Sequence, residues 1–446
     1  MGISSPTAHI NKINYFEVSP RIVRAGKTAE ITVKTKFISR YPQFVLNGMY
    51  HVAIAPVLDF EMDAASITNL HPALVEAKDG VLTFDFYFES EQDYFLKVWQ
   101  QDPDGDNRYL ILQTLLYALD EDLYDLVPLR GNTHLHSCFS DGLEEPLQHL
   151  GAALKQGFDY IALTDHNNYE GSVKAKYMLS KLEFTDIVNR LTVLNGEEFS
   201  CDYQPMHIIS LGATEAVPEE FYIKKDIPTF DNPEDKYDWI TEQLKILCDE
   251  VHKRDGLVVL CHPYWKPIHD WIRMDAPYRI IKRFLETGLV DGFEVVGGSP
   301  KHQNIVSECS HLLALESLSF SKRKYAFLGE SDSHVVNDDD ESCIFPNKYT
   351  IAFCKDNSRE SILGAIRNDL TVAVEETDGR CEYFGTLRLV NFCRFLEKYY
   401  FPKAKEVSQL YKQVFDMCAV GSFDDGKRLS DALGEVKLFE YGDLKK

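Results

Sequence analysis

The chain has 446 residues, and because a single hydrophobic core rarely grows that large, we expect two or three domains. Apolar residues make up 44% of the sequence and charged residues 26%, which is typical of a soluble globular protein. The formal net charge of −23 disfavours general binding to nucleic acids or anionic membranes, because an acidic surface repels phosphate groups.

The N-terminal stretch MGISSPTAHINKINYF has no basic region followed by an apolar core, so we expect no signal peptide. Gly2 begins no myristoylation motif, since Pro6 stands where that motif has Ser or Thr. No apolar run is long enough to span a bilayer. The ten cysteines never form a CxxC pair, which favours buried free thiols in a reducing cytoplasm. We interpret Cys138, like the other cysteines, as a small filler residue.

Residues 1–125 predict an all-β domain. "RIVRAGKTAEITVKTKF" places a turn at Gly26 before an alternation through Ile31 and Val33, and "GMYHVAIAPVLDF", "GVLTFDFYF" and "DYFLKVWQ" continue in that style. Short strands at regular spacing without a long helical pattern indicate an immunoglobulin-like β-sandwich. "DPDGD" lacks the distal Glu of a calcium loop and is interpreted as a turn.

From residue 126 the pattern changes to alternating strands and helices. "LVPLRGNTHLH" is followed by the helical "EEPLQHLGAALKQG", in which Gly157 is a candidate C-cap. The same alternation continues to "YAFLGESDSH", and it predicts parallel strands with crossover helices, arranged as a barrel or a doubly wound sheet. We expect this domain over residues 126–376 and a small, mainly helical α/β extension over 377–446.

Residues that commonly bind metals stand at the ends of the expected strands. In chain order the clusters are His134 and His136; Asp165 and His166; Glu197 and Glu198; His207, which opens its strand; His262; Glu294; and Asp332 and His334. Parallel β/α folds place their sites at the carboxyl ends of the strands, so these residues are expected to converge. Each cluster alone is weak, but so many in one series are hard to assign to chance.

The stretch "GNTHLHSCFSDG" carries the first of these clusters. His134 and His136 are two residues apart, and on a strand such residues point to the same side. Imidazole and carboxylate ligands without a thiolate suit Zn, Mn or Fe better than a structural zinc knot. Neighbouring ions of this kind lower the pKa of a bound water to about 7, and the resulting hydroxide can attack phosphorus or a carbonyl carbon.

The order H-x-H, "SDG", "TDHN", "GEE", an opening His, "CHP" and "SDSH" resembles the PHP (polymerase and histidinol phosphatase) superfamily of metal-dependent phosphoesterases, over roughly residues 126–376. The resemblance implies a distorted (β/α)7 barrel with two or three divalent metals. The ligands it implies are His134, His136, Glu198 and Asp332 for the first metal; Glu198, His207 and His262 for the second; and Asp141, His166 and His334 for the third.

The resemblance also implies further roles. Asp141 stands where some members have His, and the family's spacing selects Glu198 over Glu197. Asp165 would orient His166. The candidate catalytic residues are Asp332, His334 and Glu294, although a rim position for Glu294 is equally compatible. The candidate substrate-binding residues are Tyr264, Lys266 and Arg130; Trp265 accompanies them, and packing of the loop after "CHP" is the other interpretation for that stretch.

Together these features predict a metal-dependent hydrolase, most simply a phosphoesterase in which a metal-bridging hydroxide attacks a small phosphate ester. A sandwich followed by this barrel is also similar to a branch that includes carbamate and amide hydrolases, so an ester, amide or carbamate substrate is the first alternative. A non-catalytic metal- or ligand-binding protein is the second. We expect a small-molecule substrate and neither nucleic acid nor membrane as a partner; the sequence does not indicate the oligomeric state.

Overall fold

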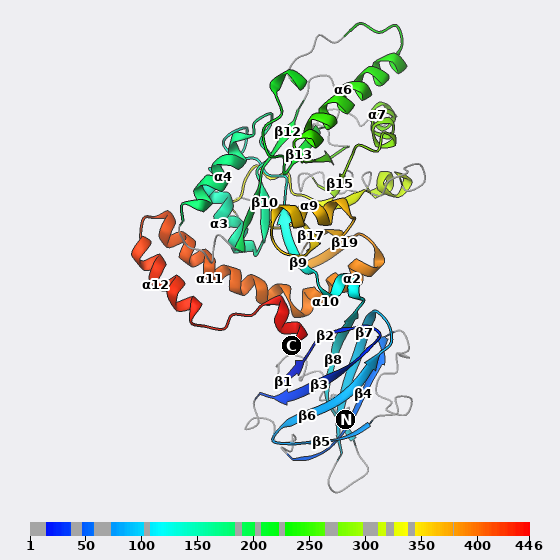
Figure 1. Cartoon of the computed structure of the whole chain (residues 1–446), viewed down its shortest axis with the longest axis vertical. Helices are drawn as coiled ribbons and strands as arrows, with labels where there is room; N and C mark the ends of the chain where they lie inside the picture. Colours follow the sequence, from blue (N-terminus) through cyan, green and yellow to red (C-terminus); the bar gives the residue numbers. More distant parts are fainter. Residues whose placement is uncertain are drawn as a thin grey trace, which may run out of the picture. The chain divides into compact units, whose positions relative to one another are not determined.

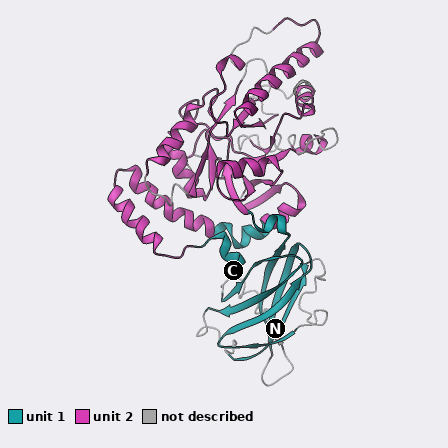
Figure 2. Ribbon diagram, in the orientation of Figure 1, with its two compact units in different colours: residues 1–126, 394–402, 439–446 teal, residues 127–393, 403–438 magenta. Residues whose placement is uncertain are grey.

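The structure is a computed structural model that describes residues 15–36, 47–57, 73–101, 108–182, 190–200, 207–222, 228–263, 275–297, 311–317, 325–337, 344–377 and 379–446. The chain divides into two compact units, coloured separately in Figure 2. Unit 1 comprises Met1–Leu126, Arg394–Pro402 and Phe439–Lys446, and unit 2 comprises Val127–Cys393 and Lys403–Leu438. Each unit is described separately below.

Unit 1 is rich in β-structure (Figure 1). One sheet has the order β1-β3-β6, formed by β1 (Phe16–Ser19), β3 (Lys27–Thr35) and β6 (Val81–Phe88). The other has the order β2-β8-β7-β4-β5, formed by β2 (Ile22–Arg24), β8 (Arg108–Leu119), β7 (Gln92–Gln101), β4 (Gly48–Pro56) and β5 (Ala73–Ala77). A short helix, α2 (Glu121–Tyr124), follows β8.

The strands of unit 1 follow the alternation in the sequence. Ile31 and Val33 on β3 are fully buried, and they share one apolar cluster with residues of the second sheet such as Leu96. The predicted turn at Gly26 is confirmed: its φ is +70°, a conformation that glycine adopts without a Cβ penalty. The N-terminal region is therefore β-rich with a shared core, while "DPDGD" lies outside the described residues.

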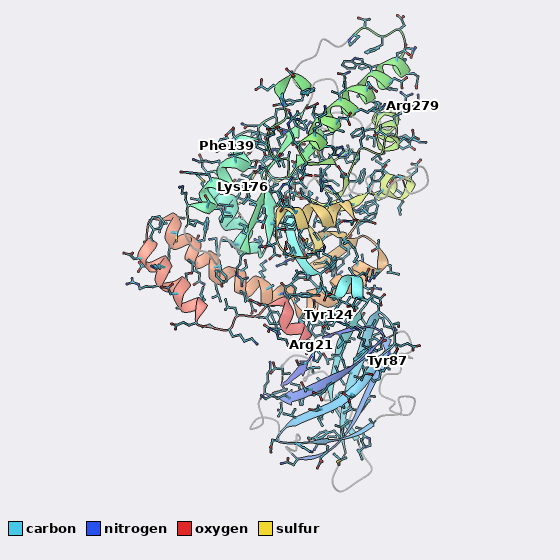
Figure 3. All side chains as sticks on the ribbon, in the orientation of Figure 1. Arg21, Tyr87, Tyr124, Phe139, Lys176 and Arg279 are labelled. Atoms are coloured by element: carbon cyan, nitrogen blue, oxygen red, sulfur yellow. The ribbon has the colours of Figure 1, made fainter. Side chains whose placement is uncertain are left out.

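The C-terminal segments of unit 1 pack on its sheets. The Tyr399 hydroxyl accepts a hydrogen bond from the backbone N–H of Leu115 (3.2 Å), and the guanidinium of Arg21, labelled in Figure 3, lies 4.5 Å from the Tyr399 ring centroid. The carbonyl oxygen of Leu444 accepts a hydrogen bond from Arg21 N (2.8 Å), and the Leu444 side chain is buried. Residues near the end of the chain thus complete a core that begins with the first strands.

Unit 2 contains two mixed sheets. The first has the order β11-β10-β9-β17-β18-β19, formed by β11 (Thr192–Leu194), β10 (Tyr160–Ala162), β9 (Val127–Asn132), β17 (Lys348–Cys354), β18 (Thr371–Thr377) and β19 (Arg380–Phe384). The second has the order β12-β13-β14-β15-β16, formed by β12 (Gly196–Phe199), β13 (His207–Leu211), β14 (Leu257–Cys261), β15 (Gly292–Val296) and β16 (Ala326–Gly329).

The prediction of parallel strands is confirmed for β9, β10 and β11 and for β14, β15 and β16, but it was wrong for β13. Strand β13 runs antiparallel to both β12 and β14, so that His207 at its start is paired with Cys261 at the end of β14. A hydrophobic run signals a buried strand but carries no information about its direction. The reversal brings the opening residue of β13 to the edge where β14 ends.

The helices of unit 2 surround these sheets (Figure 1). They are α3 (Pro146–Gln156), α4 (Glu170–Ser180), η4 (Glu219–Phe221), α6 (Pro233–Lys253), α7 (Asp275–Glu286), α9 (Arg359–Arg367) and α12 (Phe423–Gly434). Helices α10 (Leu387–Tyr399) and α11 (Phe401–Ala419) are divided between the two units, and η5 (Tyr441–Lys445) belongs to unit 1. Gly157 ends α3 in the left-handed conformation, as predicted. None of the helices in the described part of the chain combines the length and the apolar character of a membrane span.

The cysteines of the described residues are free. Cys248, Cys261, Cys354, Cys393 and Cys418 are buried, in agreement with the expected buried thiols. Cys138 is exposed, so its interpretation as a packed filler was wrong. It lies in the turn that follows His136, where the chain leaves the interior of the unit.

Candidate metal centre

The site begins directly after strand β9. His134 and His136 are both fully buried, and their Nε2 atoms lie 3.2 Å apart. Each of these Nε2 atoms is 3.1 Å from Oδ1 of Asp332, which follows β16. An isolated parallel bridge between Leu135 and Ser333 fixes these two segments side by side. The i, i+2 spacing therefore points both imidazoles at one carboxylate.

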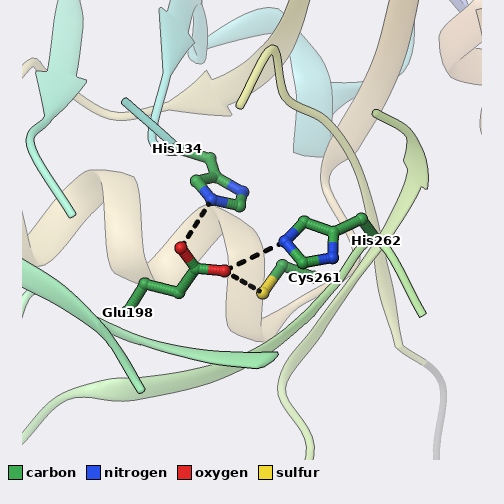
Figure 4. A group of neighbouring side chains, drawn as sticks. All are labelled: His134, Glu198, Cys261 and His262. Atoms are coloured by element: carbon green, nitrogen blue, oxygen red, sulfur yellow. Dashed lines mark hydrogen bonds and ion pairs between the residues drawn. The ribbon is translucent and has the colours of Figure 1, made fainter. Parts of the chain in front are cut away.

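Glu198, on strand β12, is the centre of the cluster, and its side chain is fully buried. Its Oε1 atom lies 2.7 Å from His207 Nδ1 and 2.9 Å from His262 Nε2. Its Oε2 atom lies 3.0 Å from His166 Nδ1 and 3.1 and 3.3 Å from the Nε2 atoms of the first two histidines. One carboxylate thus faces five imidazoles, as Figure 4 shows for two of them.

The neighbouring Glu197 faces the opposite way. Its Oε1 accepts a hydrogen bond from Val217 N (3.0 Å), because successive residues of a strand point to opposite faces. The structure therefore places Glu198, and not Glu197, among the histidines.

A more exposed group adjoins this buried centre. Asp141 Oδ2 lies 3.2 Å from His334 Nε2 and 3.8 Å from His166 Nε2, and Asp141 Oδ1 lies 3.6 Å from His136 Nδ1. The side chains of Asp141 and His334 are 55% and 37% exposed, whereas His136 is fully buried. This group therefore forms the open, solvent-exposed edge of the cluster.

Two residues of the cluster have a backbone conformation that is uncommon for residues with a side chain. The φ angles are +53° for Asp332 and +22° for His262. Such conformations cost of order 1–3 kcal/mol and persist where the surrounding structure enforces them, often at functional sites. The fold therefore holds both side chains in position at a local cost.

Charge complementarity sets the protonation of the buried centre. Burial by itself would raise the pKa of Glu198 and Asp332, but the positive charge on His134 and the adjoining imidazoles hold the pKa of each carboxyl well below its usual range. Burial would lower the pKa of His136, but hydrogen bonds to Asp332 and Glu198 raise it to about 9. His136 therefore holds a proton that a bound cation would have to displace.

The donor set fits divalent cations. Imidazole nitrogens and carboxylate oxygens are the ligands expected for Zn, Mn or Fe. Two buried atoms of the site, Glu198 Oε2 and His166 Nδ1, lie 3.0 Å apart in the middle of the cluster, and Oε2 also faces the Nε2 atoms of His136 and His134. Atoms that converge at this separation are suited to sharing a bound cation.

Several predicted residues have other surroundings. Glu294 accepts a hydrogen bond from the backbone N–H of His262 (2.8 Å) and lies 2.6 Å from His134 Nδ1, whereas the other acids contact Nε2 of that ring. Asp165 accepts hydrogen bonds from Ser137 N (2.7 Å) and Ser140 Oγ (2.9 Å), so it braces the loop after the paired histidines. We predicted that Asp165 orients His166, but the hydrogen bonds of its carboxylate go to Ser137 and Ser140.

Arg130 is the one predicted substrate-binding residue that the structure describes, and its contacts lie elsewhere than in the cluster. The guanidinium of Arg130 donates to the carbonyl oxygens of Gln156 (3.4 Å) and Gly157 (3.0 Å), at the carboxyl end of α3. These contacts commit the guanidinium to the helix end. Tyr264, Trp265 and Lys266 lie outside the described residues.

Three polar residues near the cluster were not singled out from the sequence. The Cys261 thiol lies 3.4 Å from Glu198 Oε1. Glu330 accepts hydrogen bonds from the hydroxyls of Thr133 and Thr350 (both 3.0 Å), and burial raises its pKa to about 8. Lys348 is fully buried and donates to the carbonyl oxygen of Gly297 (2.9 Å). The sequence pattern does not show which buried strand residues reach the site. The one available hint was a charged residue, Glu330 or Lys348, within an apolar stretch.

Residues 132–342 match the family model described as PHP domain. This match confirms the resemblance seen in the sequence: the whole histidine–carboxylate cluster, from His134 to His334, lies within the residues that match the PHP domain, which belongs to a superfamily of metal-dependent hydrolases.

Individual relatives are distant. A 53-residue stretch, 12% of the chain, is 36% identical to the DNA polymerase/3'-5' exonuclease PolX of Bacillus subtilis and covers 9% of that protein. An uncharacterized protein of Methanocaldococcus jannaschii is 26% identical over 148 residues, 30% of this chain and 68% of its own length.

Two solved structures are similar at low identity. One is a two-domain protein from Bacteroides vulgatus containing a predicted PHP-like metal-dependent phosphoesterase, with 19% identity and a TM-score of 0.38 over 56% of this chain and 66% of that one. The other is an amidohydrolase from Chromobacterium violaceum with bound sulfate and no metal, with 16% identity and a TM-score of 0.28 over 44% and 87% of the two chains.

Proposed function

We propose that this chain is a metal-dependent hydrolase that cleaves small phosphate esters. The observation that supports this most directly is the buried carboxylate of Glu198 facing five imidazoles, next to Asp332 and an open edge. A structural role would need only one closed set of four ligands, whereas this cluster has nine donors and an exposed side. The substrate is a small molecule, and neither nucleic acid nor a membrane is required.

The nine donors form overlapping groups that fit two or three cations. Groups with all donor atoms within 4.8 Å of one another include His134, His136, Glu198 and Asp332; His166, Glu198 and His207; and His136, Asp141, His166 and His334. His262, 2.9 Å from Glu198, extends the second of these. Divalent cations such as Zn, Mn or Fe, when bound, supply an activated water and neutralise negative charge on a phosphoryl group.

The protein's own residues would hold and orient the reacting groups. Glu294, buried against His134 Nδ1, fixes the ring so that its Nε2 faces the carboxylates. His334 is partly exposed and its Nε2 lies 3.2 Å from Asp141 Oδ2, so this side chain can contact a substrate at the open edge. Asp332 and His334 therefore remain the candidate catalytic residues, and Glu294 acts by positioning.

One observation favours keeping a carbonyl substrate as the second candidate function. A phosphate ester is usually gripped by a cationic side chain, but Arg130 is held at the end of α3 and Lys348 donates to Gly297. Neither of these two cations is therefore available to grip a phosphate at the open edge, and Lys266 lies outside the described residues. An ester, amide or carbamate would need no cationic side chain for binding, and the same metal centre could hydrolyse it.

The test is to purify the full chain, count metals by mass spectrometry, and assay phosphomonoesters, phosphodiesters, carboxylic esters, amides and carbamates. We expect two or three metals per chain and hydrolysis of a phosphate ester. Glu198→Gln should lose at least one metal and about 100-fold or more in kcat/KM, because it removes the carboxylate shared by two groups.

Glu197→Gln is the matched control, since this neighbour faces Val217 and should keep full metal content. Hydrolysis confined to carbonyl substrates would replace the first candidate by the second. Stoichiometric metal without any hydrolysis would favour a non-catalytic binding protein, and fewer than two metals with no hydrolysis would contradict the whole proposal.

The finer architecture belongs to the same proposal. We interpret the two sheets of unit 2 as parts of a distorted (β/α)7 barrel, supported by the isolated bridges Leu135–Ser333 and His166–Glu198. We interpret the two sheets of unit 1 as a β-sandwich, supported by their common apolar cluster. The buried free thiols suit a cytoplasmic location.

A further inference from the structure

Cys261 contributes a sulfur atom to the metal centre's surroundings. It is the last residue of β14, it is fully buried, and the register pairs it with His207. Its Sγ lies 3.4 Å from Oε1 of Glu198, the same oxygen that His262 Nε2 approaches to 2.9 Å. Figure 4 shows the thiol and the His262 imidazole converging on this carboxylate from neighbouring positions of one strand end.

The thiol belongs to a set of potential ligands and does not stand alone. His134, Glu198, Cys261 and His262 each offer one ligand atom, and these four atoms all lie within 4.8 Å of one another. Zinc binds sulfur at about 2.3 Å and carboxylate oxygen at about 2.0–2.2 Å, so donor atoms 3.4 Å apart can share one ion at close to the tetrahedral angle. The second oxygen of Glu198, Oε2, lies 3.3 Å from His134 Nε2, so one carboxylate connects the thiol with both imidazoles of this set.

We propose that Cys261 is a sulfur donor of the metal centre and that it makes the centre favour a thiophilic divalent cation, such as Zn²⁺ or Co²⁺, over Mn²⁺ or Mg²⁺. Soft thiolate ligands select the former, and carboxylate and water ligands suit the latter. The inference rests on the proposed metal centre. Without a cation the thiol donates to Glu198; when a cation binds, the thiol proton leaves to solvent and the sulfur lone pair takes its place on the metal.

The alternative is that the thiol only fills space and hydrogen-bonds Glu198. The two explanations separate in Cys261→Ser, because a hydroxyl keeps a hydrogen-bond donor of similar size but is a hard and weak ligand. Cys138→Ser is the matched control: this cysteine is also free, but it is exposed and is not one of the four converging residues.

The experiment is a Co²⁺ titration of the metal-free full-length wild type, Cys261→Ser, Cys261→Ala and Cys138→Ser, followed by absorption spectroscopy, with circular dichroism to verify folding. We expect visible cobalt bands in all four proteins. A near-ultraviolet sulfur-to-cobalt charge-transfer band should appear in the wild type and Cys138→Ser and should be lost in both Cys261 variants. In Zn²⁺/Mn²⁺ competition, the preference for Zn²⁺ should fall about tenfold or more in Cys261→Ser.

A wild type that shows visible cobalt bands but no charge-transfer band would overturn the role of Cys261 while leaving the metal centre intact. An unchanged zinc preference in a folded Cys261→Ser would do the same. If the wild type takes up no Co²⁺, Zn²⁺ or Mn²⁺ at all, the metal centre of the proposed function fails together with this inference.

Discussion

At the scale of single residues, unit 2 buries ionisable groups beyond those of the metal cluster. Lys348, the first residue of β17, is fully buried; its Nζ donates to the Gly297 carbonyl and lies 3.8 Å from the carboxylate of Glu375 on β18. Burial lowers the pKa of Lys348 to about 8, from 10.5 for a solvated lysine. The nearby acids only partly offset the cost of removing the ammonium group from water.

This shift predicts a pH-dependent stability. Between pH 8 and 10.5 the unfolded chain binds more protons at Lys348 than the folded chain does, so the free energy of unfolding should rise with pH. The shift corresponds to about 3 kcal/mol across that window. Lys348→Met removes this titrating group. The free energy of unfolding of the wild type, relative to that of the variant, should therefore rise by about 3 kcal/mol between pH 8 and pH 10.5.

Urea unfolding of the metal-free protein at several pH values checks this prediction. Lys355→Met provides the baseline, since Lys355 is exposed just beyond the end of the same strand. A constant difference between wild type and Lys348→Met across the window would contradict the inferred protonation of the buried lysine.

At the scale of elements, the turn after the paired histidines positions part of the metal site. Gly142 N donates to the carbonyl oxygen of Ser137 (3.0 Å), and Leu143 N donates to that of His334 (2.9 Å). A Cβ atom on Gly142 would overlap the carbonyl group of His136 and lie 2.8 Å from Ser137 N. The turn is therefore closed so tightly that only glycine fits, and Asp141 is carried by this closure.

Gly142→Ala should accordingly displace the turn that bears Asp141 and its contact with His334. We expect a loss of about 1–3 kcal/mol in stability and reduced occupancy of the exposed metal group, because backbone on both sides of His136 must shift. Gly364→Ala is the matched control: a Cβ there meets nothing within 4 Å, and alanine in helix α9 should stabilise by up to about 1 kcal/mol. Unchanged metal content in Gly142→Ala would show that the turn tolerates opening.

The elements also show how far the sequence could predict the site. The i, i+2 histidines and the strand-end acids were found because a strand has a fixed period and its end meets the ends of its neighbours. The direction of β13 could not be predicted, since an apolar run such as HIISL has the same pattern in a parallel and in an antiparallel strand. The contacts of Arg130 and Cys261 could not be predicted either. Strands β9 and β14 are buried on both faces, so no alternation of apolar and polar residues shows which side chains reach the site.

At the scale of the whole molecule, the chain carries two separate sets of buried apolar residues. One cluster, with Ile31 and Leu96, lies in unit 1; two others, around Leu247 and Leu257, lie in unit 2. The end of the chain contributes to unit 1, where Tyr441 and Leu444 are buried. The sequence predicted a helical C-terminal extension but gave no signal that its last residues return to the first strands.

Two cores of this kind predict two unfolding transitions in calorimetry. The candidate metal ligands lie in unit 2, so a chelator should lower one transition and leave the other in place. A site whose metal is present at about 100 times its dissociation constant would lose roughly 2.7 kcal/mol of stabilisation when the metal is removed. Deleting Phe439–Lys446 should lower the other transition, because it exposes the partners of Tyr441 and Leu444, while the metal content of the truncated chain stays that of the wild type. The same transition responding to both treatments would mean that the two units unfold as one, and that the end of the chain supports the metal centre as well as the β-sheets.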